Sequence, residues 1–146
     1  MISMEKNTLE NDIAEQKRYW EIAVGNMQES AAPYLISDKK AANSTKQQKT
    51  YVLDQSTKEL IMNISKGSEQ LIHVILATGL ISLIGLCSKE KYISLGVLPT
   101  GECKNKVLPM VIDTLRAKNF KDLLLSVRSQ YVNVLKYQDF DLGEVS

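Results

Sequence analysis

The sequence predicts an α/β fold in which a small mixed sheet is covered by helices. Apolar residues recur at helical spacing near both ends of the chain, and a long apolar stretch occupies its middle. Two segments rich in β-forming residues lie between that stretch and the last helix. A chain of 146 residues has the length of one domain. We therefore expect a single domain at 1–146, with a helix at 9–28, an exposed connector at 30–49 and an α/β core at 50–142.

The N-terminal helix is predicted from its apolar positions, which fall on one face: Leu9, Ile13, Trp20, Ala23, Val24 and Met27. From Ser30 to Lys49 the chain is dominated by Ala, Ser, Lys, Asn and Gln, which is typical of an exposed connector. The segment Thr50 to Asp54, "TYVLD", is then predicted to be a short strand.

Two consecutive helices are predicted in the middle of the chain. Ser56 and Glu59 have the spacing of a capping box, and Lys66-Gly67 end that helix. Ser68 can cap the next one, which contains "LIHVILATGLISLIGL" and ends near Cys87. A membrane span needs about 20 apolar residues. This run is shorter and is interrupted by polar residues and glycines, so we expect a buried helix in a soluble domain and no membrane.

The C-terminal half is predicted to contain two strands and a helix. Tyr92–Pro99 and Lys106–Asp113 are the strands, joined through a turn at Thr100-Gly101. Pro109 indicates an edge position or an irregularity. Asn119 can cap the last helix. The predicted apolar face of that helix contains Phe120, Leu123, Leu124, Val127, Tyr131, Val134 and Leu135.

The residues that could carry chemistry are few. The formal net charge of +1 gives no reason to expect a nucleic-acid partner. Cys87 and Cys103 lack the spacing of a zinc site, and Cys87 is expected to be a small buried hydrophobe. His73 is the only conventional proton shuttle, and we expect it to be a hydrogen-bonded core residue. We therefore predict no catalytic, cofactor-binding or metal-ligating residue and no cofactor. The N-terminus lacks a secretion signal, so a cytoplasmic location is expected.

The ordered set of segments resembles part of the condensation domains of nonribosomal peptide synthetases. In that family a helix containing Tyr-Trp is followed by a variable linker, a strand and a short helix, as Tyr19-Trp20 and "TYVLDQSTKELIMNIS" are here. An apolar helix then precedes a "GxPxxGR" strand, matched by Gly96, Pro99 and Gly101. The family then has a "NTLPxR" segment, which Leu108-Pro109 match in part. It continues with a helix that begins with Phe and ends near His-Gln-Asp, and residues 120–139 correspond to that helix. The resemblance covers about Ile13 to Leu142.

The resemblance implies a fragment of the chloramphenicol acetyltransferase-like fold, which has two similar α/β lobes. The family's catalytic HHxxxDG motif lies in the lobe that this chain does not match, and His73 lies in the wrong helix to replace it. Glu102 stands where the family has Arg, the "GxFxN" segment is missing, and Tyr137 replaces the His of His-Gln-Asp. The resemblance therefore implies a truncated, catalytically inactive condensation domain that retains part of the C-terminal lobe.

Such a fragment would act as a structural or protein–protein interaction module in antibiotic biosynthesis, N-terminal to an adenylation domain. The expected partners are that domain, another synthetase domain or a partner synthetase subunit. Self-association through an exposed sheet edge is a further expectation, because truncation of a sheet exposes strand edges. One alternative is a split acyltransferase completed in trans by a chain carrying HHxxxDG. Another is an unrelated small α/β protein.

Overall fold

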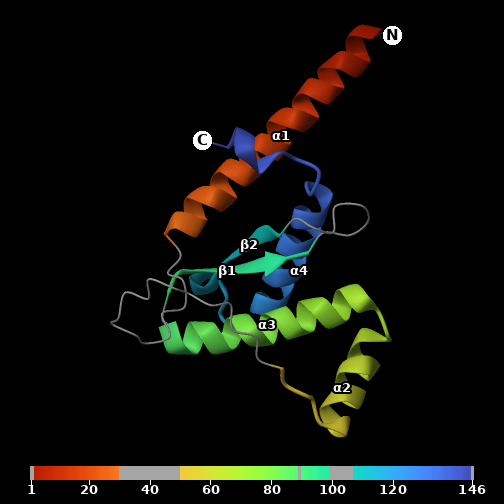
Figure 1. The fold of residues 1–146 in the computed structure, drawn as a ribbon, viewed down its shortest axis with the longest axis vertical. Coiled ribbons are helices and arrows are strands. Elements are labelled where there is room, and N and C mark those ends of the chain that lie inside the picture. The colour runs from red at the N-terminus through yellow and green to blue at the C-terminus, as the bar shows by residue number, and fades with distance from the viewer. Residues whose placement is uncertain (1, 30–49, 89, 99–106, 146) are drawn as a thin grey trace.

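A computed structural model describes residues 2–29, 50–88, 90–98 and 107–145. These residues form four α-helices and one two-stranded sheet, with short 3-10 turns at Thr114–Arg116 and Leu142–Glu144 (Figure 1). The element order is α1 (Ile2–Gln28), α2 (Gln55–Ser65), α3 (Glu69–Ser88), β1 (Tyr92–Val97), β2 (Leu108–Asp113) and α4 (Phe120–Lys136). The predicted α/β class is confirmed for the described residues.

The sheet is antiparallel, so the predicted mixed sheet is wrong for the part of the chain that the structure describes. Ile93 pairs with Ile112, Leu95 with Met110 and Val97 with Leu108. Because side chains alternate across a strand, these six lie on one face. Pro109 pairs with Gly96. A Cβ at Gly96 would lie 2.6 Å from the Val107 side chain, so a larger residue would force that side chain to move.

α1 packs on one face of the sheet, whereas α3 and α4 pack on the other (Figure 1). Beyond the sheet, α1 also meets α4 directly, through Tyr19 with Gln130 and Trp20 with Tyr137. On the side of α1, Val24 and Met27 line a shallow cavity with Ser94, Gly96 and Pro109 of the strands. The opposite face contributes the apolar core, which includes the fully buried Leu108, Met110 and Ile112. From the helices, that core receives Val74, Ala77, Ile81, Leu123, Val127, Tyr131 and Val134.

The first half of the chain differs from the prediction in three places. α1 begins at Ile2 rather than near residue 9. "TYVLD" is not a strand, and it lies exposed without a neighbouring strand in the described structure. The Asp54 side chain instead accepts a hydrogen bond from the backbone N–H of Thr57 and caps α2. The predicted capping box at Ser56 is therefore wrong, because an aspartate two residues earlier already satisfies that helix end. The connector at 30–49 lies outside the described residues.

The predicted C-terminal end of α2 and both predicted ends of α3 are confirmed. Lys66 adopts the left-handed conformation at the C-cap of α2, and Gly67 follows with φ 73°. Ser68 accepts a hydrogen bond of 3.4 Å from the Leu71 backbone N–H through its hydroxyl oxygen, and α3 ends at Ser88. Asn119 caps α4 as predicted, since its side chain accepts from the Asp122 N–H. The turn at Thr100-Gly101 lies outside the described residues.

Burial follows the prediction only in part. Trp20, Val127 and Val134 are fully buried, as expected of core positions. Phe120, by contrast, is 57% exposed, and Cys87 is exposed rather than a buried hydrophobe. α3 buries Val74, Ala77, Thr78 and Ile81, whereas its other face exposes leucines. The predicted buried helix is therefore buried on one side only, because α3 packs on its neighbours from that side.

Candidate functional site

His73 lies in the first turns of α3, where its ring stacks on that of Tyr131 in α4. The ring centroids are 4.6 Å apart. Its Nε2 atom is buried and has no hydrogen-bond partner among the described residues. The prediction of a hydrogen-bonded core histidine is therefore correct only for the packing of the ring, because Nε2 has no hydrogen-bond partner among the described residues. A groove of about 250 Å³ next to it is lined by Leu76, Leu80, Leu95 and Met110 among others.

The surroundings of His73 are apolar. Burial lowers the pKa of the imidazole below its usual 6.5, because the protein surroundings solvate the charged form poorly. A general base is normally oriented by a second polar group such as a carboxylate. The contact that the structure records for this ring is aromatic, with Tyr131. This geometry suits packing better than proton transfer.

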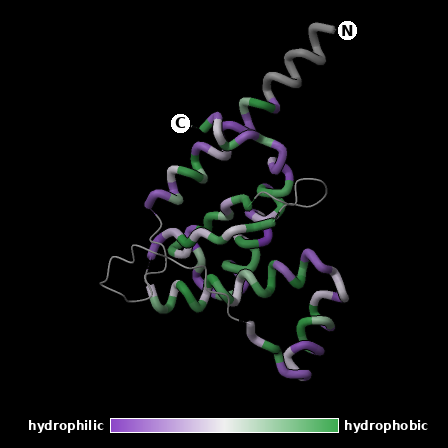
Figure 2. The backbone as a smooth tube through the Cα atoms, in the orientation of Figure 1, coloured by the Kyte–Doolittle hydropathy of each residue, from purple (hydrophilic) through white to green (hydrophobic). Residues whose placement is uncertain are grey.

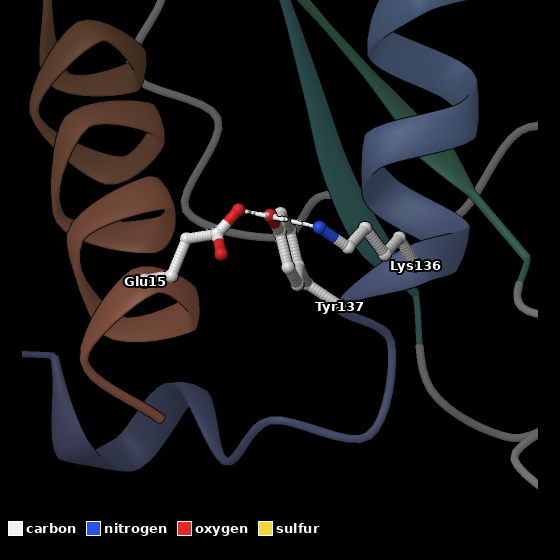
Figure 3. Close-up of polar contacts among 3 residues, drawn as sticks. All are labelled: Glu15, Lys136 and Tyr137. Carbon is white, nitrogen blue, oxygen red and sulfur yellow. Dashed lines mark hydrogen bonds and ion pairs between the residues drawn. The ribbon is translucent and has the colours of Figure 1, made fainter. Parts of the chain in front are cut away.

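The most developed polar cluster joins α1 to the end of α4 and contains Glu15, Lys136 and Tyr137 (Figure 3). The Tyr137 hydroxyl donates a hydrogen bond to Oε1 of Glu15. Nζ of Lys136 donates to the same carboxylate oxygen over 3.2 Å and to the Tyr137 hydroxyl over 2.9 Å. The three groups therefore form a closed triangle, which joins Glu15 to two residues more than 120 positions later in the chain.

This cluster stabilises the ionised carboxylate and the ammonium. The hydrogen bonds from Tyr137 and Lys136 lower the pKa of Glu15, and the same contacts raise the pKa of Lys136. Tyr19 packs beside Tyr137 with ring centroids 5.0 Å apart, and its burial raises its pKa to about 12. Glu15 and Lys136 are thus held in their charged states, and Tyr19 in its neutral one. The cluster fastens α1 to α4.

The sequence indicates these residues only in part. Tyr19-Trp20 and Tyr137 stand at positions of the resembled family, whereas Glu15 and Lys136 carry no local signal. Their partnership depends on the packing of the first helix against the last, which no short-range pattern encodes. Among the described residues, no group of His, Cys, Asp or Glu side chains is arranged to hold a metal ion. Cys103 lies outside those residues.

A hollow of about 460 Å³ opens between the end of α3 and the start of α4. Its apolar lining includes three strongly exposed side chains: Leu86 at 80%, Leu115 at 71% and Phe120 at 57%. The charged residues Glu90 and Lys118 contribute to the same hollow. An apolar centre with charged residues beside it is the composition typical of a protein–protein contact.

α3 exposes a second apolar surface. Apolar residues recur along the whole helix (Figure 2), and Leu76, Leu80 and Leu83 are 47%, 47% and 60% exposed. In the described structure, α3 is the one helix long and apolar enough to cross a membrane, judged by length and composition alone. Core helices of soluble proteins satisfy the same criteria. α3 contacts α2, α4 and β1.

Comparisons with protein-family models, curated proteins and solved structures found no match for this chain.

Proposed function

We propose that this chain is a catalytically inactive, condensation-like module of a nonribosomal peptide synthetase. It retains part of one lobe of the chloramphenicol acetyltransferase-like fold and acts in the cytoplasm as a docking element for a neighbouring synthetase domain. The observation that carries the proposal is the apolar hollow between α3 and α4, with Leu86, Leu115 and Phe120 exposed in it.

The hollow has the features of a docking surface. Phe120 stands at the first position of α4, which is held by the Asn119 cap and by the core contacts of Leu123. A large aromatic side chain on a rigid element is a typical anchor in protein–protein contacts. Glu90 and Lys118 bring one charge of each sign to the hollow, which favours a partner with complementary charges over a purely apolar one.

The absence of catalysis is proposed from the state of the only histidine. Acyl transfer between carrier-bound substrates needs a base placed beside the reacting groups and a site that excludes water. His73 is stacked on Tyr131 with a lowered pKa, in a helix that does not correspond to the family's HHxxxDG segment. The Glu15, Lys136 and Tyr137 cluster serves helix packing rather than substrate binding.

The partner that we propose is an adenylation domain, because condensation and adenylation domains adjoin in the synthetases that this sequence resembles. The test is binding between this chain and the adenylation domain encoded nearest to it, measured by isothermal titration calorimetry. We expect Phe120→Asp to weaken that binding at least about 10-fold, because a buried, unpaired carboxylate is costly at an apolar contact. Val132→Asp is the matched control, since Val132 is 55% exposed on the same helix but does not line the hollow.

Circular dichroism should show the same helix content for both variants. Equal binding by Phe120→Asp and Val132→Asp, or no binding by the unmodified chain, would overturn the docking proposal. Peptide-bond formation on mixing this chain with a separate lobe that carries HHxxxDG would overturn its inactivity. That result would establish the split acyltransferase instead.

A further inference from the structure

The sheet has two strand edges, and the hydrogen bonds between its strands show which backbone groups lie on them. Among the described residues the sheet contains only β1 and β2, so each strand has one edge without a strand partner. Next to the ladder, the Thr114 N–H donates to the Lys91 carbonyl over 2.8 Å. Hydrogen-bonded and non-bonded pairs alternate in an antiparallel ladder, so the neighbouring pair of Tyr92 with Asp113 is non-bonded. The backbone groups of the non-bonded residues therefore point outward from the sheet.

This alternation makes the two edges unequal. The outward residues are Tyr92, Ser94 and Gly96 on β1, and Pro109, Val111 and Asp113 on β2. Proline has no N–H, so the β2 edge lacks one donor, whereas β1 keeps all three. No backbone hydrogen bond joins the outward groups of β1 to another described residue. β1 is thus the edge that can accept a further strand.

The chemistry of the β1 edge selects the kind of molecule that can cover it. Donors and acceptors alternate along this edge, and an extended peptide backbone presents the matching alternation. A helix satisfies its backbone groups internally, and a hydrocarbon surface has no hydrogen-bonding group to offer. The groove of about 250 Å³, lined by Leu80 and Leu95 among others, lies beside the same strand. An extended segment with apolar side chains is therefore the occupant that fits both features.

The chain itself contains a segment of this kind. Residues 50–54, "TYVLD", have the composition of a strand and lie exposed without a neighbouring strand in the described structure. Tyr51 is 81% exposed, Val52 93% and Leu53 48%. Side chains alternate along an extended chain, so Tyr51 and Leu53 can face the groove together while Val52 faces the opposite side. The molecule thus has both an edge without a strand and a strand-forming segment without an edge.

The segment is separated from the β1 edge of its own chain. It ends at Asp54, whose side chain caps α2. α2 packs against α3, and α3 lies between α2 and the sheet (Figure 1). Pairing within one chain would therefore require α2 to leave α3. A second copy has no such restriction, and the small net charge of +1 gives little repulsion between copies.

We propose that two copies of this chain associate by strand exchange, in which residues 50–54 of each copy add to the β1 edge of the other. The exchange is reciprocal about a two-fold axis, so each dimer contains two identical junctions. Neither junction includes the hollow at Phe120, so the inference stands independently of the docking proposal.

Sedimentation velocity over a concentration series tests the proposal at the receiving edge. Ser94→Pro removes one outward N–H of β1 and leaves the hydrogen bonds to β2 in place, and Ser94→Ala is its matched control. The unmodified chain and Ser94→Ala should show a concentration-dependent dimer. Ser94→Pro should weaken that dimer at least about 10-fold, because the added strand loses a donor and meets the proline ring. Circular dichroism checks that both variants are folded.

A second variant tests the donated segment and decides the matter if Ser94→Pro fails to fold. Successive N–H groups of a strand point toward opposite edges, so the double variant Val52→Pro, Leu53→Pro removes a donor to β1 in either register. Both residues precede the Asp54 cap and lie outside the helices, so the helix content should be unchanged. This double variant should also weaken the dimer at least about 10-fold.

Three results would overturn the proposal. The first is a monomer of the unmodified chain at every concentration. The second is equal dimerisation of folded Ser94→Pro and Ser94→Ala. The third is undiminished dimerisation of the double proline variant, which would show that another part of the second copy makes the contact.

Discussion

The indole N–H of Trp20 donates a buried hydrogen bond of 3.1 Å to the main-chain carbonyl of Tyr137, 117 residues further along the chain. Trp20 is fully buried, and its ring meets that of Tyr19 edge to face. The Trp20 side chain thus packs in the core beneath α1 and donates a hydrogen bond to a main-chain carbonyl at the end of α4. The position of the first helix depends strongly on this residue.

Trp20→Phe should lower the free energy of unfolding by about 2 kcal/mol, because the buried Tyr137 carbonyl loses its donor. Trp20→Ala should lower it by about 3–5 kcal/mol, because a cavity is added. Urea unfolding followed by circular dichroism measures both. Ile22→Ala is the control, since Ile22 is 57% exposed on the same helix, and a change within about 0.5 kcal/mol is expected. A loss as large for Ile22→Ala as for Trp20→Ala would contradict the role of the buried indole.

Asn119→Ala should destabilise the protein by about 1 kcal/mol, because the Asp122 backbone N–H loses the side-chain acceptor 2.9 Å away. Asn119→Ser should retain most of the stability, since a hydroxyl can accept the same bond. Thermal unfolding of the three proteins checks the ranking. If serine proved as damaging as alanine, the cap would not be the cause.

Two glycines should respond to alanine in opposite directions. Gly85 lies within α3, and an added Cβ would meet only Ile93 Cδ1 at an ordinary 3.5 Å. Gly85→Ala should therefore raise the free energy of unfolding by about 0.5–1 kcal/mol, through its better helix propensity. Gly67 has φ 73°, in the left-handed region that disfavours a side chain. Gly67→Ala should therefore lower the free energy of unfolding by about 1 kcal/mol. Parallel urea titrations measure the pair, and a shift of the same sign in both variants would refute this account.

The pH dependence of stability should change in His73→Phe. The pKa of His73 is lower in the folded protein than the 6.5 of the unfolded chain. On acidification the unfolded chain takes up the proton first, so stability falls as the pH drops through about 6.5 toward the folded pKa. His73→Phe keeps the ring stacked on Tyr131 but cannot titrate, so its curve should be flatter between about pH 7 and 5. Urea unfolding at several pH values measures the difference between the two curves.

Glu15 also contributes to the pH dependence of stability, so the curves of the unmodified chain and of His73→Phe have to be compared. Its pKa is lowered by Tyr137 and Lys136, so its stabilising effect is also lost on acidification, below the usual 4.5 of a glutamate. Both proteins contain this carboxylate, and its effect cancels in the difference. Identical curves for the unmodified chain and His73→Phe would show that the imidazole titrates normally.

Local signals in the sequence predicted much of the fold correctly. The stop at Lys66-Gly67 and the caps at Ser68 and Asn119 are confirmed, because capping uses atoms within a few residues of one another. The two β-rich segments pair as a hairpin. "TYVLD" has the composition of a strand, yet a strand needs a partner to satisfy its backbone, and the described structure offers it none.

The sequence by itself determined the helices, the caps at Ser68 and Asn119 and the two β-rich segments, because these depend on the preferences of adjacent residues. Only the tertiary structure decided which face of α3 is covered, since an apolar run does not specify how many neighbours surround it. The tertiary structure alone also joined Glu15 to Tyr137, and Trp20 to the end of α4. These contacts link residues more than 100 positions apart, and their geometry follows from the packing of whole helices on the sheet.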